Sequence, residues 1–311
     1  MRKIAILLSI LVCTLFLFSC SQKEPDFKST TLVFSDDAGN SIHVEEKPKK
    51  VAVLFSSHAE MVLLAGGSVD ITVGESVERG FVNDSTPLVD SGAGKQINTE
   101  LLISHNPDFV VGSFDVPAHR EASELLNTAG IPCALFRVED FSDYERVMKI
   151  LCDIFENDDA YQKNVAEVNR GIDDVLSRIP DGDKKKILFV RCASSSKATK
   201  AKTKKENFVC AMLDQMNTYN IAESAPVLQG GLSTEEIILQ NPDYIFFSTM
   251  GDENAAKAYM TGVLESDQWQ TLDAVKNGNY TFLDKELFQY KPNNRWDKAY
   301  KILAELLYGK D

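Results

Sequence analysis

The sequence predicts an α/β protein of two lobes, each built on a parallel β-sheet covered by helices. The first observation behind this prediction is an internal repeat, in which residues 97–110 match residues 232–245 at a constant offset. The second is a helical pattern of apolar residues over 158–179, between the two copies. The third is the length of 311 residues, which leaves room for two cores. A single α/β domain is the alternative, which the repeat disfavours.

The chain begins with a segment typical of export. Arg2 and Lys3 precede an apolar run over 4–18, broken only by Ser9 and Thr14. At 1.5 Å per residue this run reaches only about 22 Å, which is too short for a stable transmembrane helix. We therefore predict a signal peptide over 1–19.

Cys20 is the expected first residue of the processed chain. The pair Ser19 and Cys20 resembles the end of a bacterial lipobox, in which the cysteine carries the lipid, although Phe18 stands where a small residue is usual. Residues 20–30 are mostly polar and are expected to form a lipid-anchored tether. A plain secretory signal with an incidental Cys20 is the alternative.

Each copy of the repeat is expected to be a helix followed by a strand. Asn98 and Ser233 stand at the N-cap positions, and an Asn-Pro pair then ends each helix. Apolar strands follow over 109–112 and 244–247. A second match pairs the strands expected at 51–55 and 187–191. These runs are continuously apolar rather than alternating, which is typical of parallel strands buried on both faces.

A single long helix is expected to join the lobes over 158–179, within a linking segment assigned to residues 158–180. Its 22 residues would reach about 33 Å, with Asp158 as the cap and Pro180 just beyond the end. The N-terminal lobe is therefore assigned to residues 31–157 and the C-terminal lobe to residues 181–311.

Composition excludes several classes of protein. The 46 acidic residues outnumber the 33 basic ones and give a net charge of −13, so a general affinity for nucleic acid is not expected. The cysteines show no zinc-type spacing. Those beyond the tether lie among apolar neighbours and are expected to be buried free thiols: Cys133, Cys152, Cys192 and Cys210.

These features together resemble the helical-backbone class of ABC-transporter substrate-binding proteins, which includes siderophore, haem and vitamin B12 binders. The resemblance covers nearly all of the chain after residue 36. Its best local pieces are Asn98–Asp108, Leu232–Asp243, Trp269–Gly278 with the strand Tyr280–Leu283, and the loop Phe288–Trp296.

The resemblance implies a fold of two Rossmann-like lobes with a ligand cleft between them, and a function in import. The protein would be an extracytoplasmic, lipid-anchored monomer in the cell envelope that captures a ferric siderophore and hands it unchanged to the permease dimer. It would need no cofactor and would not act as an enzyme. Haem or a corrinoid is the alternative cargo, and a metal-ion receptor or a secreted α/β hydrolase is a more distant one.

Glu100 and Glu235 occupy equivalent places in the repeat. In the family that the chain resembles, one acidic residue on each lobe docks onto arginines of the permease, and by position these would be Glu100 and Glu235. Two equivalent carboxylates also suit a two-fold symmetric partner. The alternative is that they only complement the helix dipole in a first turn.

The ligand is expected beyond the carboxyl ends of the strands, where open α/β sheets bind their ligands. Aromatic rings and guanidinium groups gather in the segments that follow the strands and suit a bulky organic anion. The predicted contacts are Phe55, Ser57, His58, Arg79, Arg191, Tyr290 and Arg295. Neighbouring candidates in the same segments are Ser56, Phe114, Arg137, Met250 and Lys291.

Several of these residues have a structural alternative. His58 could ligate haem iron, but an ordinary βα-turn residue is expected instead, and Trp296 is expected in the core. The other histidines, His43, His105 and His119, are not clustered in the sequence, which argues against a zinc or manganese receptor. The lysines between 197 and 205 could steer an anion or form a solvated loop. Ser57 and His58 lack a Gly-x-Ser-x-Gly context for hydrolysis.

Overall fold

A computed structural model describes residues 31–90 and 96–309. The predicted signal peptide, Cys20 and the tether lie outside these residues. Among the helices of the two ranges, none combines the length and the apolar character that crossing a membrane requires. Residues 32–309 belong to one unit and are described together below.

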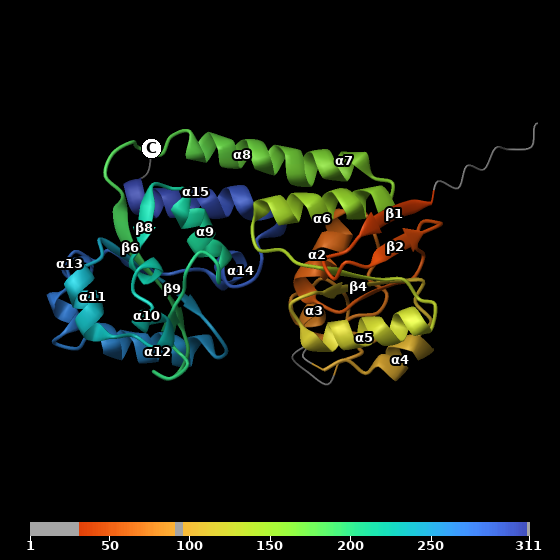
Figure 1. Cartoon of the computed structure of the whole chain (residues 1–311), viewed down its shortest axis with the longest axis horizontal. Coiled ribbons are helices and arrows are strands. Elements are labelled where there is room, and N and C mark those ends of the chain that lie inside the picture. Colours follow the sequence, from red (N-terminus) through yellow and green to blue (C-terminus); the bar gives the residue numbers. More distant parts are fainter. Residues whose placement is uncertain (1–30, 91–95, 310–311) are drawn as a thin grey trace, which may run out of the picture. The chain divides into compact units, whose positions relative to one another are not determined.

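The first half of the chain forms a hairpin and a three-stranded parallel sheet (Figure 1). The hairpin consists of β1 (Leu32–Ser35) and β2 (Ser41–Val44). The sheet has the order β3 (Val51–Val53), β4 (Phe109–Ser113), β5 (Cys133–Phe136), and every residue of these three strands is buried. The surrounding helices are α2 (Ser56–Leu64), α3 (Gly74–Glu78), α4 (Thr99–Ser104), α5 (Pro117–Thr128) and α6 (Phe141–Ile154).

The second half contains a five-stranded sheet with β6 (Lys185–Cys192) at its centre. β8 (Thr218–Asn220) and β9 (Tyr244–Thr249) pair with β6 in parallel, and β10 (Tyr280–Phe282) pairs in parallel with β9. β7 (Lys200–Ala201) is antiparallel to β6, so the prediction of a purely parallel sheet was wrong at this edge.

The helices of the second half are mostly short. The α-helices are α9 (Phe208–Asp214), α10 (Val227–Gly230), α11 (Thr234–Gln240), α12 (Glu253–Leu264), α13 (Asp273–Lys276), α14 (Lys285–Phe288) and α15 (Trp296–Tyr308). Single 3₁₀ turns are η3 (Ile221–Glu223), η4 (Trp269–Thr271) and η5 (Asn293–Arg295).

The internal repeat is present in three dimensions. In each copy a capped helix, α4 or α11, leads into a strand, β4 or β9, that pairs in parallel with the earlier strand of the same sheet. Asp108 accepts a hydrogen bond from the backbone N–H of Lys50, and Asp243 accepts the equivalent bond from Lys186. Asn106 and Asn241 both take left-handed backbone angles at the helix ends. The predicted repeat is therefore confirmed.

Alternate residues of the strands point to different layers of the core. In the first sheet, Ala52 and Val110 pack with α4 and α5, whereas Val53 and Val111 pack with α2 and α6. The latter layer continues to Phe189 of β6, so one hydrophobic cluster takes residues from both sheets. The division into lobes at 158–180 stays a prediction, because this shared layer runs past it.

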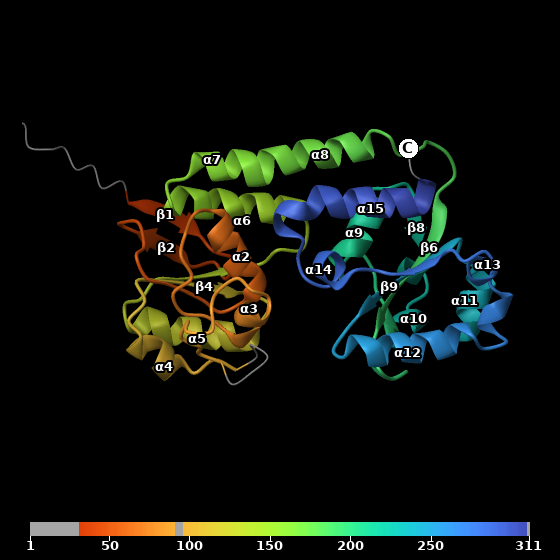
Figure 2. The ribbon, with the colours of Figure 1, turned by 180° about the vertical axis from the view of Figure 1, so that it is seen from behind.

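The segment expected as one linking helix is helical without interruption over 158–176. It consists of α7 (Asp158–Tyr161), a π-helical turn η2 (Gln162–Ala166) and α8 (Glu167–Leu176). Asn157, not Asp158, is the cap, and its Oδ1 accepts a hydrogen bond from the N–H of Ala160 at 3.1 Å. Figure 2 shows α8 running alongside α15.

Gly171 allows α8 to approach α15 closely. A Cβ atom built at Gly171 would lie 2.8 Å from the Cβ atom of Asp297 on α15. We expect Gly171→Ala to lower the free energy of unfolding by about 1 to 3 kcal/mol, because the helices must separate. Gly262→Ala on α12 is the matched control, since its Cβ meets no atom within 4 Å and alanine favours helix. Urea denaturation of both variants measures their free energies of unfolding. Equal values for Gly171→Ala and Gly262→Ala would contradict the close approach of α8 to α15.

The cysteine prediction is confirmed for the four residues that the structure describes. Cys133, Cys152, Cys192 and Cys210 are all buried and free. Burial raises the pKa of Cys133 and of Cys192 to about 12, so these thiols stay protonated at neutral pH. Trp296 is also in the core as expected, with its ring edge-on to Phe208.

Candidate ligand-binding site

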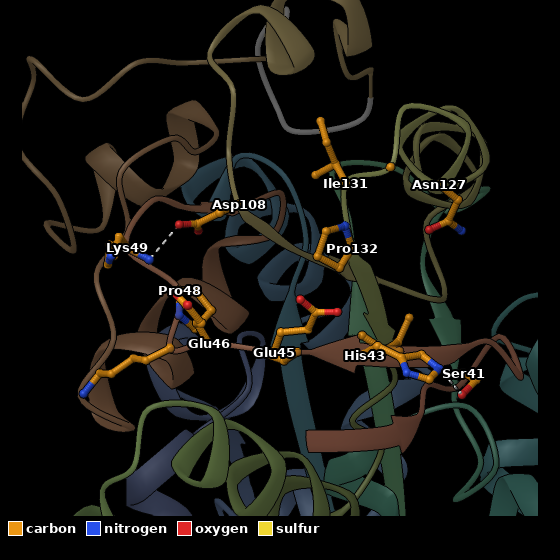
Figure 3. A pocket seen from close by; sticks show the side chains of 14 residues that line it. Ser41, His43, Glu45, Glu46, Pro48, Lys49, Asp108, Asn127, Ile131 and Pro132 are labelled. Atoms are coloured by element: carbon orange, nitrogen blue, oxygen red, sulfur yellow. Dashed lines mark hydrogen bonds between the residues drawn. The ribbon is translucent and has the colours of Figure 1, made fainter. Parts of the chain in front are cut away.

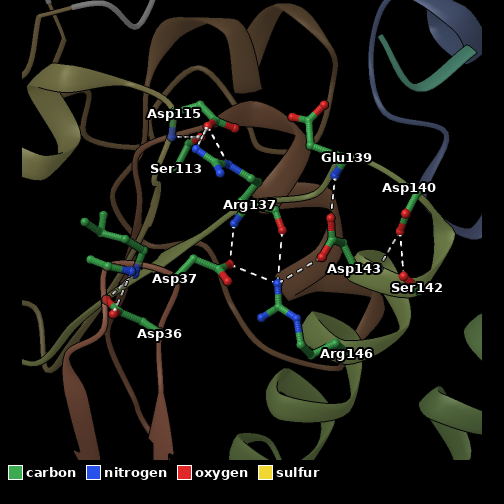
Figure 4. A network of polar contacts seen from close by, with 12 residues as sticks. Asp36, Asp37, Ser113, Asp115, Arg137, Glu139, Asp140, Ser142, Asp143 and Arg146 are labelled. Atoms are coloured by element: carbon green, nitrogen blue, oxygen red, sulfur yellow. Dashed lines mark hydrogen bonds and ion pairs between the residues drawn. The ribbon is translucent and has the colours of Figure 1, made fainter. Parts of the chain in front are cut away.

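The carboxyl edge of the first sheet presents aromatic and charged side chains. Phe55 follows β3 and precedes α2, Phe114 follows β4, and Arg137 follows β5. The Arg137 guanidinium lies 4.6 Å from the Phe114 ring centroid and forms a 2.7 Å ion pair with Asp115 (Figure 4). Both partners of this pair are nearly half exposed, so it contributes little to stability and can be rearranged by a ligand.

His58 is packed into the protein interior. Its ring is 3% exposed and lies edge-on to Phe55 and to Phe136. Burial, and then the neighbouring His119, lower the pKa of His58 to about 3, so the ring is neutral. His58 is the third residue of α2, so it belongs to the helix that follows β3 rather than to the turn before it. Ser57 is likewise buried, at 2% exposure.

Arg79 is held from several sides. Its side chain is only 4% exposed, and its Nη1 donates to the Oγ atoms of Ser56 and Ser57 at 3.3 Å. The guanidinium also stacks on Tyr290, 4.1 Å from the ring centroid. The predicted residues Ser57, Arg79 and Tyr290 therefore lie together. In this structure Arg79 positions the loop that carries Tyr290 rather than facing solvent.

Glu60 is the residue at this site that the sequence did not reveal. It sits on α2, with a side chain 12% exposed, and its Oε1 lies 2.9 Å from Nη2 of Arg295. Nδ2 of Asn293 donates to its Oε2 at 2.7 Å, and Arg79 lies 3.8 Å away. Burial raises the pKa of Glu60, and Arg295 opposes this shift most strongly. The only signal in the sequence is an acid inside the apolar run of α2.

Lys291 joins the same group of side chains. Its Nζ lies 3.8 Å from Oε1 of Glu139, which follows β5, and 4.8 Å from the ring centroid of Phe208. Burial lowers the pKa of Lys291 and raises the pKa of Glu139. The loop before α15 thus brings Tyr290, Lys291 and Arg295 to the edge of the first sheet.

Arg191 is different from the other arginines of the site. It lies near the carboxyl end of β6, where its Nη2 donates to the sulfur of Met250 at 2.6 Å. No carboxylate among the described residues lies within ion-pair distance of it, and its buried Nε lacks a hydrogen-bond partner there. Its neighbour across the strands is another cation, Lys200. A guanidinium in this position suits an anionic group from outside the protein.

The lysine-rich loop is partly neutralised by the protein itself. Lys202 pairs with Glu206 at 3.4 Å, and Lys204 pairs with Asp214 at 2.8 Å. Lys197 and Lys205 are exposed. These contacts favour a solvated loop over a steering patch.

The two predicted docking residues occupy matching places. Glu100 is the second residue of α4 and Glu235 the second residue of α11, and both are exposed. Each helix is capped as expected: Asn98 accepts from the N–H of Leu101 at 3.0 Å, and Ser233 accepts from that of Glu236 at 3.4 Å. Neither glutamate forms an ion pair with another described residue. Their role in docking stays a prediction.

Three of the cavities formed by the described residues lie away from the predicted ligand contacts. The largest, of about 620 Å³, is lined by Lys49, Asp108 and Pro132, which precede the three strands of the first sheet, and so it opens at their amino ends (Figure 3). A cavity of about 490 Å³ lies between α8 and α15, and one of about 420 Å³ lies beside α13. Within the described ranges, no group of three or more His, Cys, Asp or Glu side chains is arranged for a metal ion.

The chain is similar to known proteins along most of its length. Residues 51–287 match the model of a family described as periplasmic binding protein. The chain is 25% identical over 303 residues to the petrobactin-binding protein YclQ of Bacillus subtilis (strain 168), with 91% of this chain and 92% of the relative covered. It is 21% identical over 324 residues to the putative ABC transporter substrate-binding lipoprotein YhfQ of the same organism, with 98% and 97% covered.

A solved structure with the same fold is that of the siderophore-binding protein BauB, bound to a complex of two acinetobactin molecules and ferric iron. Its TM-score is 0.70 at 15% sequence identity, with 90% of this chain and all of that chain covered. This likeness, together with the sheets described above, confirms the predicted α/β fold class.

Proposed function

This chain belongs to the periplasmic binding protein family, and from that premise we propose that it is the substrate-binding component of an ABC importer for a ferric siderophore. It captures the chelate outside the cytoplasm and delivers it unchanged to the permease. The observation that carries the choice of cargo is the match to a petrobactin-binding protein over 91% of the chain. Arg191, which faces no described carboxylate, supports an anionic cargo.

Haem is the alternative cargo, and the position of His58 speaks against it. A haem receptor that ligates iron through this residue would need its ring at the surface of the site, whereas the ring is 3% exposed. Its pKa of about 3 reflects the same burial. Haem held through its propionates alone would still suit the guanidinium groups, so the cargo must be identified directly.

The proposal includes two partners of the protein. The first is the membrane, reached through a lipid on Cys20, and the relative YhfQ is named as a lipoprotein. The second is the permease dimer, which Glu100 and Glu235 would contact from equivalent places in the repeat. Exposure of both carboxylates supports this contact.

Purification from the native host tests the cargo and the anchor together. We expect detergent extracts of the membrane to yield the protein with an iron chelate that absorbs broadly in the visible range. Mass spectrometry of the digested protein should find Cys20 as the acylated first residue. Titration of the emptied protein with ferric petrobactin should then quench its fluorescence. A Soret band would instead identify haem, and a freely secreted chain that keeps residues before Cys20 would remove the anchor.

A further inference from the structure

Glu60 places a negative charge inside a group of cations. Its carboxylate touches Arg295 with both oxygens, at 2.9 and 3.1 Å, and lies 3.8 Å from Arg79. A protein that binds anionic cargo through arginines has no need of an acid among them unless the acid has a role of its own. Glu60 either ties the loop before α15 to α2 or occupies the place of the cargo's anionic group.

Asn293 shows how the loop can stay in place without Arg295. Its side chain is fully buried, and its Nδ2 donates both to the backbone carbonyl of Ser57 at 3.0 Å and to Glu60 at 2.7 Å. The backbone contact does not depend on any charge. Arg295, by contrast, is 29% exposed, so its guanidinium can turn outward while Asn293 holds the loop on α2.

We propose that Glu60 is an internal competitor of the cargo. An anionic group of the bound chelate replaces Glu60 as the ion-pair partner of Arg295, while Glu60 keeps its hydrogen bond from Asn293. This inference rests on the proposed function and names a residue that sets the affinity and its dependence on pH. An uncharged cargo group has no means of displacing Glu60, so the exchange also selects for anionic chelates.

The exchange couples binding to a proton. The groups that face Glu60 are Arg79 beside α3, Arg295 of η5, Glu286 of α14 and Tyr144 of α6. Burial already raises the pKa of Glu60, and Arg295 is the strongest influence in the opposite direction. Loss of Arg295 to the cargo therefore raises this pKa further, so that the complex takes up protons. Binding then strengthens as the pH falls towards the pKa of Glu60.

The test is a comparison of Glu60→Gln with the wild type in titrations with ferric petrobactin. Glutamine keeps an oxygen for Asn293 and removes the charge. We expect it to lower Kd about tenfold at pH 8, the equivalent of about 1.4 kcal/mol, and the difference to shrink as the pH falls. Glu124→Gln, on an exposed carboxylate of α5 that takes no part in this group, is the matched control and should change Kd less than twofold. In Arg295→Ala, the same change at Glu60 should no longer tighten binding.

Calorimetry in two buffers of different ionisation enthalpy measures the protons directly. We expect the wild type to take up protons when it binds the ferric chelate, and Glu60→Gln to take up fewer. Weaker binding by Glu60→Gln with a lower melting temperature would show that Glu60 only ties the loop down, and an unchanged proton count would also overturn the exchange. If neither form binds a ferric chelate, the proposed function fails and this inference falls with it.

Discussion

We expect cells that carry Glu100→Lys and Glu235→Lys together to lose uptake of the ferric chelate to background, while the purified variant binds it within about twofold of the wild-type Kd. The reason is geometric: both carboxylates are exposed at the second position of equivalent helices. A pair of like charges in a repeated setting suits two equivalent cationic patches on a permease dimer. Reversal turns two attractions into two repulsions, and like-charge contacts across an interface cost several kcal/mol.

The control for this prediction separates docking from helix stability. A negative charge in a first turn stabilises a helix by about 0.3 to 1 kcal/mol, so each reversal also has a local cost. Melting curves measure that cost. Glu124→Lys with Glu265→Lys reverses one exposed charge in each half of the chain, on α5 and at the end of α12 instead of on α4 and α11, and should leave uptake intact. Normal uptake by the Glu100 and Glu235 double variant would show that these residues only complement the helix dipole.

The repeat made the fold predictable because its signals are local. N-caps, Asn-Pro stops and continuous apolar strands each depend on a few neighbouring residues, and Asn98, Ser233 and Asn241 act in the structure as the sequence indicates. β7 was missed because it has two residues and belongs to a lysine-rich stretch that shows no strand pattern. The π-helical turn at 162–166 was missed because the apolar spacing of the segment fits a regular α-helix.

The candidate site was predictable only in part, for a reason that lies in chain topology. Placing residues at strand ends found Arg79, Tyr290 and Arg295, and the structure brings these three together. Glu60 was missed because its partners are remote: Asn293 is 233 positions away in the chain, and Arg295 is 235 positions away. A sequence pattern within a single segment does not predict a contact between residues so far apart in the chain. Among the partners of Arg79, Ser56 and Ser57 are only 23 and 22 positions away, but Tyr290 comes from the distant loop before α15.

Arg191→Ala is expected to weaken binding of the ferric chelate by about tenfold to a hundredfold, the loss of one charge-assisted contact of about 1.5 to 3 kcal/mol. Arg79 and Arg295 share Glu60, and Arg137 pairs with Asp115, so each of these arginines has a carboxylate partner within the protein. Arg191 meets only the sulfur of Met250 among the described residues, so an anionic cargo is the partner that it lacks. In the free protein, Arg191 is partly desolvated without an anionic partner, which costs free energy. Binding of an anionic cargo would offset this cost by supplying the partner.

Two further substitutions make the Arg191 prediction specific. Arg191→Lys keeps the charge but not the forked guanidinium, so it should bind with intermediate affinity. Arg170→Ala removes an exposed arginine at the fourth position of α8 and should leave Kd unchanged. Because burial of Arg191 near Met250 leaves its Nε unsatisfied, Arg191→Ala should not lower the melting temperature. Equal Kd values for Arg191→Ala and the wild type, measured by fluorescence titration, would show that the cargo does not reach the end of β6.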